Sequence, residues 1–167
     1  MTHGTLLLFA AAVATADLLT KIAIVRRFPV GSVQPVLDGW FNIVHFRNPG
    51  AVFGLGAELG RAVPWILTGA SVIIAAVVFA TALRTPLADR WTQIGLHLVL
   101  GGAIGNIVNR LTLGPVVDFL DVYLRTARGE HHWPAFNIAD SAICVGIGVL
   151  LLAGFRKPPA TTREGLA

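Results

Sequence analysis

Charged residues are scarce in this sequence, which excludes a soluble domain of ordinary composition. Only 13% of the 167 residues are Asp, Glu, Lys or Arg, whereas 54% are hydrophobic. Soluble domains usually carry about 25% charged residues. We therefore expect a single membrane domain over residues 1–167, a membrane all-α bundle of four transmembrane helices. The apolar stretches, each long enough to cross a bilayer core, are residues 4–25, 62–83, 91–109 and 136–155.

Cysteine is almost absent, and this excludes an intrachain disulfide. The one cysteine, Cys144, lies in the fourth apolar stretch, where a thiolate is disfavoured. We expect it to be a small packed residue. His131 and His132 are adjacent, but no Cys or His cluster at ligand spacing joins them. The sequence therefore predicts no metal site, and no cofactor is implied.

A basic stripe with interleaved aromatic residues is also missing, although the formal net charge is +4. Basic residues placed at the ends of apolar stretches are typical of a membrane interface, not of a nucleic-acid surface. We expect contact with membrane lipid and no nucleic-acid partner. The residues concerned are Arg26, Arg27, Arg61, Arg84, Arg90, Arg156 and Lys157.

The first stretch has an alternative interpretation as a cleaved signal peptide, because Ala14-Thr15-Ala16 has the small residues of a cleavage site. Two features oppose it. No Lys or Arg precedes the apolar core, and the apolar run continues to Val25. We expect a retained span that carries Asp17 and Lys21, which lie four residues apart on one helical face and can pair.

Two aspartates beside the spans are candidate functional residues, because a carboxylate in or near hydrocarbon is costly. Asp118 lies just beyond the third stretch, and Asp140 lies about one turn inside the fourth. Four spans place both termini on one side, so the connections 26–61 and 110–135 share the other side. Asp118 and Asp140 are therefore expected near the same face. Two close carboxylates that share one proton can activate water for hydrolysis.

Orientation does not follow from charge. The side with the termini holds five basic residues and the other side seven, but the five occupy shorter segments.

The first long connection is expected to form a small extramembrane β-hairpin. Val33–Leu37 and Trp40–Phe46 are β-prone runs on either side of Asp38-Gly39, a strong hairpin signal. The hairpin can cradle an extended peptide by strand addition. It can equally only shield the helices.

The third stretch contains Gly101 and Gly105, a small-residue pair that lets another helix approach closely. Asn106 and Arg110 share a face at the end nearest Asp118. Arg110 can pair with a carboxylate or reach lipid phosphate. Asp121, three residues after Asp118, is expected to be a solvated surface residue.

Five sequence blocks in order resemble the lipoprotein signal peptidases, the bacterial signal peptidase II family. The likeness covers nearly the whole chain. The blocks are Asp17-x3-Lys21, Asn48-Pro49-Gly50-Ala51-Val52-Phe53, Gly101-Gly102-Ala103-Ile104-Gly105-Asn106-x3-Arg110, Val116-Val117-Asp118-Phe119 and Phe136-Asn137-Ile138-Ala139-Asp140-Ser141. Many family members have Asp where this chain has Asn109, so we leave that position out of the site.

The resemblance implies an aspartic endopeptidase that removes signal peptides from prolipoproteins whose lipobox cysteine carries diacylglycerol, cutting on the amino side of that cysteine. It also implies a monomer in the bacterial cytoplasmic (inner) membrane, termini cytoplasmic and active site at the outer face, that is inhibited by globomycin-type compounds. The catalytic pair would be Asp118 and Asp140. The supporting residues would be Asp17, Lys21, Asn48, Asn106, Arg110 and Asn137.

Two other classes of protein fit the composition. A small proton-coupled transporter or channel subunit also carries intramembrane Asp, Lys and His, although the polar residues here gather toward one face and no repeat is visible. In a structural assembly factor, the aspartates would only cap or pair; Asp140 suits a helix start. Replacing each aspartate by Asn separates these from a peptidase.

Overall fold

The computed structural model describes residues 2–50 and 62–156. Four helices in this part of the chain are long and apolar enough to cross a membrane. Their bounds agree with the four predicted stretches to within a few residues. The helices are α1 (His3–Arg27), α2 (Val63–Arg84), α3 (Arg90–Leu113) and α4 (Ile138–Arg156).

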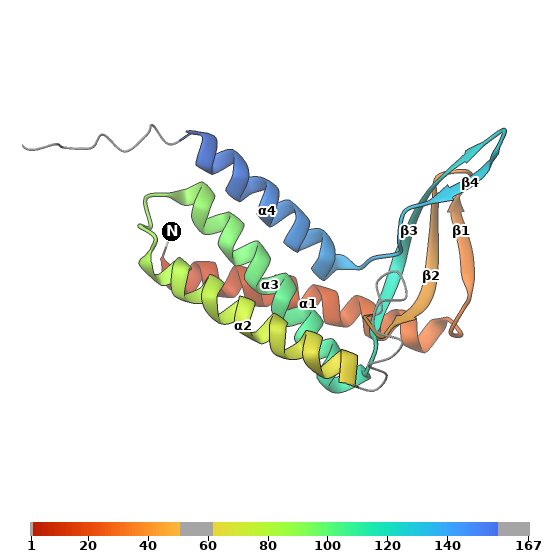
Figure 1. Ribbon diagram of the computed structural model, residues 1–167, viewed down its shortest axis with the longest axis horizontal. Coiled ribbons are helices and arrows are strands. Elements are labelled where there is room, and N and C mark those ends of the chain that lie inside the picture. The colour runs from red at the N-terminus through yellow and green to blue at the C-terminus, as the bar shows by residue number, and fades with distance from the viewer. Residues whose placement is uncertain (1, 51–61, 157–167) are drawn as a thin grey trace, which may run out of the picture.

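Helix α3 is the centre of the bundle and packs against α1, α2 and α4 (Figure 1). Its glycines make this possible. A Cβ on Gly101 or Gly105 would lie 2.7 Å from Ala10 O or from Asp17 Oδ2 of α1. A Cβ on Gly102 would collide with the Ala139 carbonyl of α4. The predicted close approach at Gly101 and Gly105 is thus confirmed, and α1 is an integral part of the bundle.

A four-stranded antiparallel sheet stands at one end of the bundle, in the order β1-β2-β3-β4 (Figure 1). The predicted hairpin is confirmed, although it is only half of the sheet. The sequence interpretation assigns no strand to the connection 110–135, yet these residues supply β3 and β4. The strands are β1 (Val33–Leu37), β2 (Phe41–Asn48), β3 (Val116–Thr126) and β4 (Gly129–His132).

The sheet is attached to α1 by a small apolar core. Ile24 of α1 packs with Val117 and Phe119 of β3, and Phe28 joins them. His45 of β2 is buried and its Nδ1 lies 2.7 Å from the Phe28 carbonyl oxygen. Strand β3 therefore has a fixed position at the end of the bundle where α3 ends and α4 begins.

Strand β3 contains a β-bulge directly after Asp118. The amide nitrogens of Phe119 and Leu120 both donate to the carbonyl oxygen of Phe136, at 2.9 and 2.8 Å. Phe119 and Leu120 therefore both lie opposite the single residue Phe136. This bulge shifts the alternation of side chains along β3 by one position. Asp121 consequently shares the sheet face of Asp118.

Cys144 departs from expectation. Its side chain is exposed on the outside of α4, not packed in the bundle. The reason is geometric: α4 meets α3 through Gly102 and Ala139 and through Gly146 and Gly95, and Cys144 lies off that line of contact.

Candidate active site

Asp118 and Asp140 approach each other from different elements, β3 and the first turn of α4. Asn137 connects them. Its Nδ2 donates to Asp118 Oδ1 at 2.8 Å, and its backbone nitrogen lies 3.3 Å from Asp140 Oδ2. Asp118 is only 4% exposed, Asn137 is fully buried and Asp140 is half-buried. The structure thus brings together the two aspartates that the sequence singled out.

The start of α4 holds Asp140 in place through a reciprocal cap. The Asp140 amide nitrogen donates to Asn137 Oδ1 at 3.0 Å, while the Asp140 carboxylate receives the Asn137 amide. This is the arrangement of a capping box, in which two helix-end donors are satisfied by each other's side chains. A carboxylate is also favoured at a helix N-terminus. Asp140 therefore has a fixed rotamer and remains accessible on one side.

A buried polar network continues from Asp140 to α1. Asn106 Nδ2 donates to Asp140 Oδ1 at 2.8 Å, and Asn106 Oδ1 accepts from Lys21 Nζ at 2.8 Å. Lys21 Nζ also pairs with Asp17 Oδ2 at 2.7 Å, both side chains being fully buried. Asp17 Oδ1 then accepts from the Ala139 amide at 2.9 Å, next to Asp140. The network returns to its starting point and fixes α1, α3 and α4 relative to one another.

Asn48 and Arg110 complete the set of predicted supporting residues. Asn48, from β2, donates to Asp118 Oδ2 at 3.0 Å and accepts the Gly50 amide at 2.8 Å. Arg110 lies near the two aspartates at the end of α3, but its Nη1 contacts only Ser71 Oγ, at 3.5 Å, among the described residues. Asn48 orients Asp118 directly, whereas Arg110 contributes a positive charge and forms no ion pair with any described residue.

Burial changes the acidity of Asp118. Loss of hydration raises its pKa from 3.8 to about 6, and the nearby Asp140 charge acts in the same direction. The hydrogen bonds from Asn48 and Asn137 and the charge of Lys21 oppose that rise. Asp118 can therefore keep a proton at a pH at which an ordinary aspartate has lost it.

Asn109, which the sequence interpretation left out of the site, positions β3. It is fully buried, and its Nδ2 donates to the carbonyl oxygens of Gly114 and Pro115 at 3.3 and 3.2 Å. Its Oδ1 accepts the Val117 amide at 3.1 Å. Asn109 thus holds the turn that places Asp118 beside α4. The sequence signal was its spacing, eight residues before Val117 across a Gly-Pro turn.

The prediction for Asp121 is wrong. Its side chain is not solvated: the residue is 5% exposed and accepts hydrogen bonds from Asn42 Nδ2 at 2.8 Å and from His132 Nδ1 at 2.9 Å. The cause is the pairing of β3 with β4, which brings His132 across the sheet from the second connection.

No group of three or more His, Cys, Asp and Glu that could hold a metal ion occurs within residues 2–50 and 62–156.

Comparisons with known proteins agree with this geometry. The family model described as Signal peptidase (SPase) II matches residues 9–156. The chain belongs to this family. It is 46% identical to a lipoprotein signal peptidase of Syntrophotalea carbinolica over 90% of this chain and 91% of that one. It is 39% identical to the lipoprotein signal peptidase of Aeromonas hydrophila, over 84% and 82%.

Solved structures extend the likeness to the fold. A bacterial membrane enzyme determined by the in meso method at 2.3 Å resolution superposes with a TM-score of 0.72 at 27% identity, covering 99% of this chain and 96% of the other. A second one, at 1.9 Å resolution, gives a TM-score of 0.71 at 28% identity. The signal peptidase II family identifies the chain as a multi-pass membrane peptidase that removes signal peptides from lipoproteins.

Proposed function

We propose that the protein is an aspartic endopeptidase acting on diacylglyceryl-modified prolipoproteins and that it cuts on the amino side of the modified cysteine. The observation that carries this proposal is the Asn137 bridge, which holds Asp118 and Asp140 beside each other at the end of the bundle. Two carboxylates in such a position cannot comfortably both be ionised, so they share one proton.

The surroundings of Asp118 and Asp140 indicate which carboxyl group donates a proton and which one accepts it. Asp118, whose pKa burial raises to about 6, is the proton donor to the scissile carbonyl oxygen. Asp140, oriented by Asn106 and by its cap, is the ionised partner that removes a proton from water. The water oxygen bonds to the carbonyl carbon and gives a tetrahedral intermediate with two hydroxyl groups. One hydroxyl returns its proton to Asp118, the C–N bond breaks, and the leaving amine takes the proton that Asp140 removed from water.

The site's surroundings fit a membrane-bound substrate. A groove of about 400 Å³ between α1 and α4 is lined by apolar and small residues and includes Ser141, next to Asp140. A lipid-modified peptide can enter it laterally from the bilayer. We propose that the protein lies in the bacterial cytoplasmic membrane as a monomer, with both termini cytoplasmic and the site at the outer face. Globomycin-type inhibitors would compete there with substrate.

Purified protein in detergent, incubated with a diacylglyceryl-modified prolipoprotein, tests the proposal by gel shift. Wild type is expected to cut, whereas Asp118→Asn and Asp140→Asn stay folded and do not. An uncut substrate with folded wild type would contradict the peptidase and favour a transporter. Variants that fail to fold would favour an assembly factor. A mutant that cuts at the wild-type rate would contradict the pair.

A further inference from the structure

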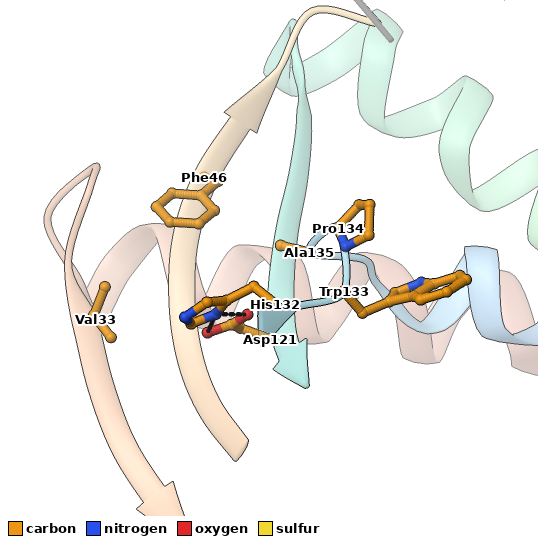
Figure 2. A pocket seen from close by; sticks show the side chains of 7 residues that line it. All are labelled: Val33, Phe46, Asp121, His132, Trp133, Pro134 and Ala135. Carbon is orange, nitrogen blue, oxygen red and sulfur yellow. Dashed lines mark hydrogen bonds and ion pairs between the residues drawn. The ribbon is translucent and has the colours of Figure 1, made fainter. Parts of the chain in front are cut away.

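A second concave site lies on the sheet, away from the two catalytic aspartates. It is a pocket of about 470 Å³ with Asp121 and His132 at its base (Figure 2). Its walls are apolar and are formed by Val33, Phe46 and the segment from Trp133 to Ala135. We name it the sheet pocket. The proposed chemistry at Asp118 and Asp140 uses none of these residues.

The base of the sheet pocket is preorganised. His132 Nδ1 lies 2.9 and 3.1 Å from the two Asp121 carboxylate oxygens, and its ring stacks on Tyr123 with centroids 4.9 Å apart. Asn42 donates to the same carboxylate. Asn42 of β2 and His132 of β4 thus hold the Asp121 carboxylate, and a bound group would meet a carboxylate with a fixed position.

The sheet pocket lies on the same face of the sheet as Asp118. The register pairs Phe46 with Asp118 and Asn42 with Asp121, and Phe46 lines the pocket together with Asp121, so their side chains lie on one face. The bulge at Phe119 puts Asp118 and Asp121 on that same face. A peptide held extended at Asp118 and leaving the membrane therefore passes over the sheet pocket. In a prolipoprotein, that outgoing segment is the one that follows the scissile bond.

The acidic side chains at this pocket and in contact with it (Asp121, Glu130 and Asp38) outnumber the basic ones (Arg125 and His132) by one when His132 is protonated. Asp121 lies in the pocket, and Glu130 Oε2 is 3.6 Å from His132 Nε2. Arg125 is engaged by two carboxylates, Asp38 and Glu130, each at 2.8 Å. Among the described residues that line the pocket, His132 is then the positive group. A side chain with an apolar stem and a positively charged end fits the apolar walls and this charge, whereas an acidic side chain is repelled.

We propose that the sheet pocket is a subsite for the segment on the carboxyl side of the scissile bond and that it favours a Lys or Arg side chain over an acidic one. This inference rests on the proposed peptidase function. Asp121 is its specificity-determining residue and lies outside the reacting atoms. The subsite therefore affects KM and not kcat.

The test uses two diacylglyceryl-modified prolipoproteins that differ only in having Lys or Glu residues directly after the modified cysteine. The assay is at pH 6, because the hydrogen bond to Asp121 raises the pKa of His132 and keeps it charged there. We expect wild type to have a KM roughly three- to fivefold lower for the Lys substrate, the range of an exposed ion pair, with similar kcat for both.

Two variants should change this preference in opposite directions. Asp121→Asn removes the carboxylate and should bring the KM ratio close to one. His132→Gln keeps a donor to Asp121 but removes the positive charge, so the ratio should increase. His131→Ala is the matched control, since His131 is the neighbouring β4 residue on the opposite face and should leave the ratio unchanged.

Three results would overturn the inference: equal KM values for the two substrates in wild type, a preference that persists in Asp121→Asn, or variants that lower the melting temperature and move the ratio in the same direction. The last result would mean that the Asp121–His132 pair only joins β4 to β3. If wild type cuts neither substrate, the proposed function itself fails, and this outcome is distinct from the other three.

Discussion

Asp118 and Asp121 lie on the same strand, on the same face and at the same depth, yet their surroundings differ. Asp118 is 4% exposed and Asp121 5% exposed. Asp118 receives two neutral amides, from Asn48 and Asn137, and lies beside a second aspartate. Asp121 receives one amide and an imidazole. Residue type and burial therefore do not separate the proposed reactive carboxylate from the proposed binding one, and the difference between them lies in the charge of their neighbours.

Asp17 gives a third arrangement of the same residue type. It is fully buried, but Lys21 neutralises it at 2.7 Å and the Ala139 amide occupies its other oxygen. Asp17 and Lys21 form a structural pair, and its effect on catalysis is indirect, through Asn106 and the start of α4.

The largest expected effect separates the two β3 aspartates. Asp118→Asn should lower kcat by about 10³-fold, the usual worth of an acid–base group, while Asp121→Asn should keep kcat within about threefold because it touches no reacting atom. Steady-state cleavage of a diacylglyceryl-modified prolipoprotein by both variants checks this. Equal losses in kcat would remove the distinction.

The buried pair should respond asymmetrically to substitution. Lys21→Met leaves the Asp17 charge without its partner inside the bundle, so we expect the free energy of unfolding to fall by about 3–5 kcal/mol. Asp17→Asn combined with Lys21→Met should recover much of that loss, since no charge is then buried alone. Unfolding in detergent, followed by circular dichroism, measures both. A double variant no more stable than Lys21→Met would show that the charge is not the cause.

The contact between α3 and α4 gives a smaller effect. In Gly102→Ala the new Cβ meets the Ala139 carbonyl and the Ile143 side chain, so α4 must move and carry Asp140 with it. We expect a loss of stability of about 1–3 kcal/mol, as for overpacked cores, and slower cleavage. Gly154→Ala is the control, because no atom of the described residues lies within 4 Å of its added Cβ. Similar melting temperatures for the two variants would contradict the close packing.

The smallest effect concerns pH. Cleavage should fall as the pH rises through about 6, where Asp118 loses its proton. Asn48 donates to the ionised carboxylate and so lowers the pKa of Asp118. Asn48→Ala should therefore raise that pKa and move the alkaline limb to higher pH. Profiles of kcat/KM between pH 4 and 9 measure the shift, and a limb that moves to lower pH would refute the assigned role.

The sequence was sufficient to predict the four spans, because long apolar runs have few alternatives in a membrane protein. It also placed Asp118 near Asp140, since an even number of spans forces the two connections to one side. It could not predict β3 and β4: the Val116–Tyr123 run is apolar at most positions, and its bulge depends on Phe136. The burial of Asp121 could not be predicted from the sequence for the same reason: His132 contacts Asp121 only when β4 is paired with β3.

In the proposed mechanism, burial and a second carboxylate make Asp118 a proton donor. A carboxyl titration by nuclear magnetic resonance, on protein with ¹³C-labelled aspartate and with Asp118→Asn for assignment, measures this directly. We predict one carboxyl signal that titrates near pH 6 and disappears in Asp118→Asn. If the Asp118 signal titrates in the ordinary range near pH 4 instead, the site lacks the acid that the proposed hydrolysis requires.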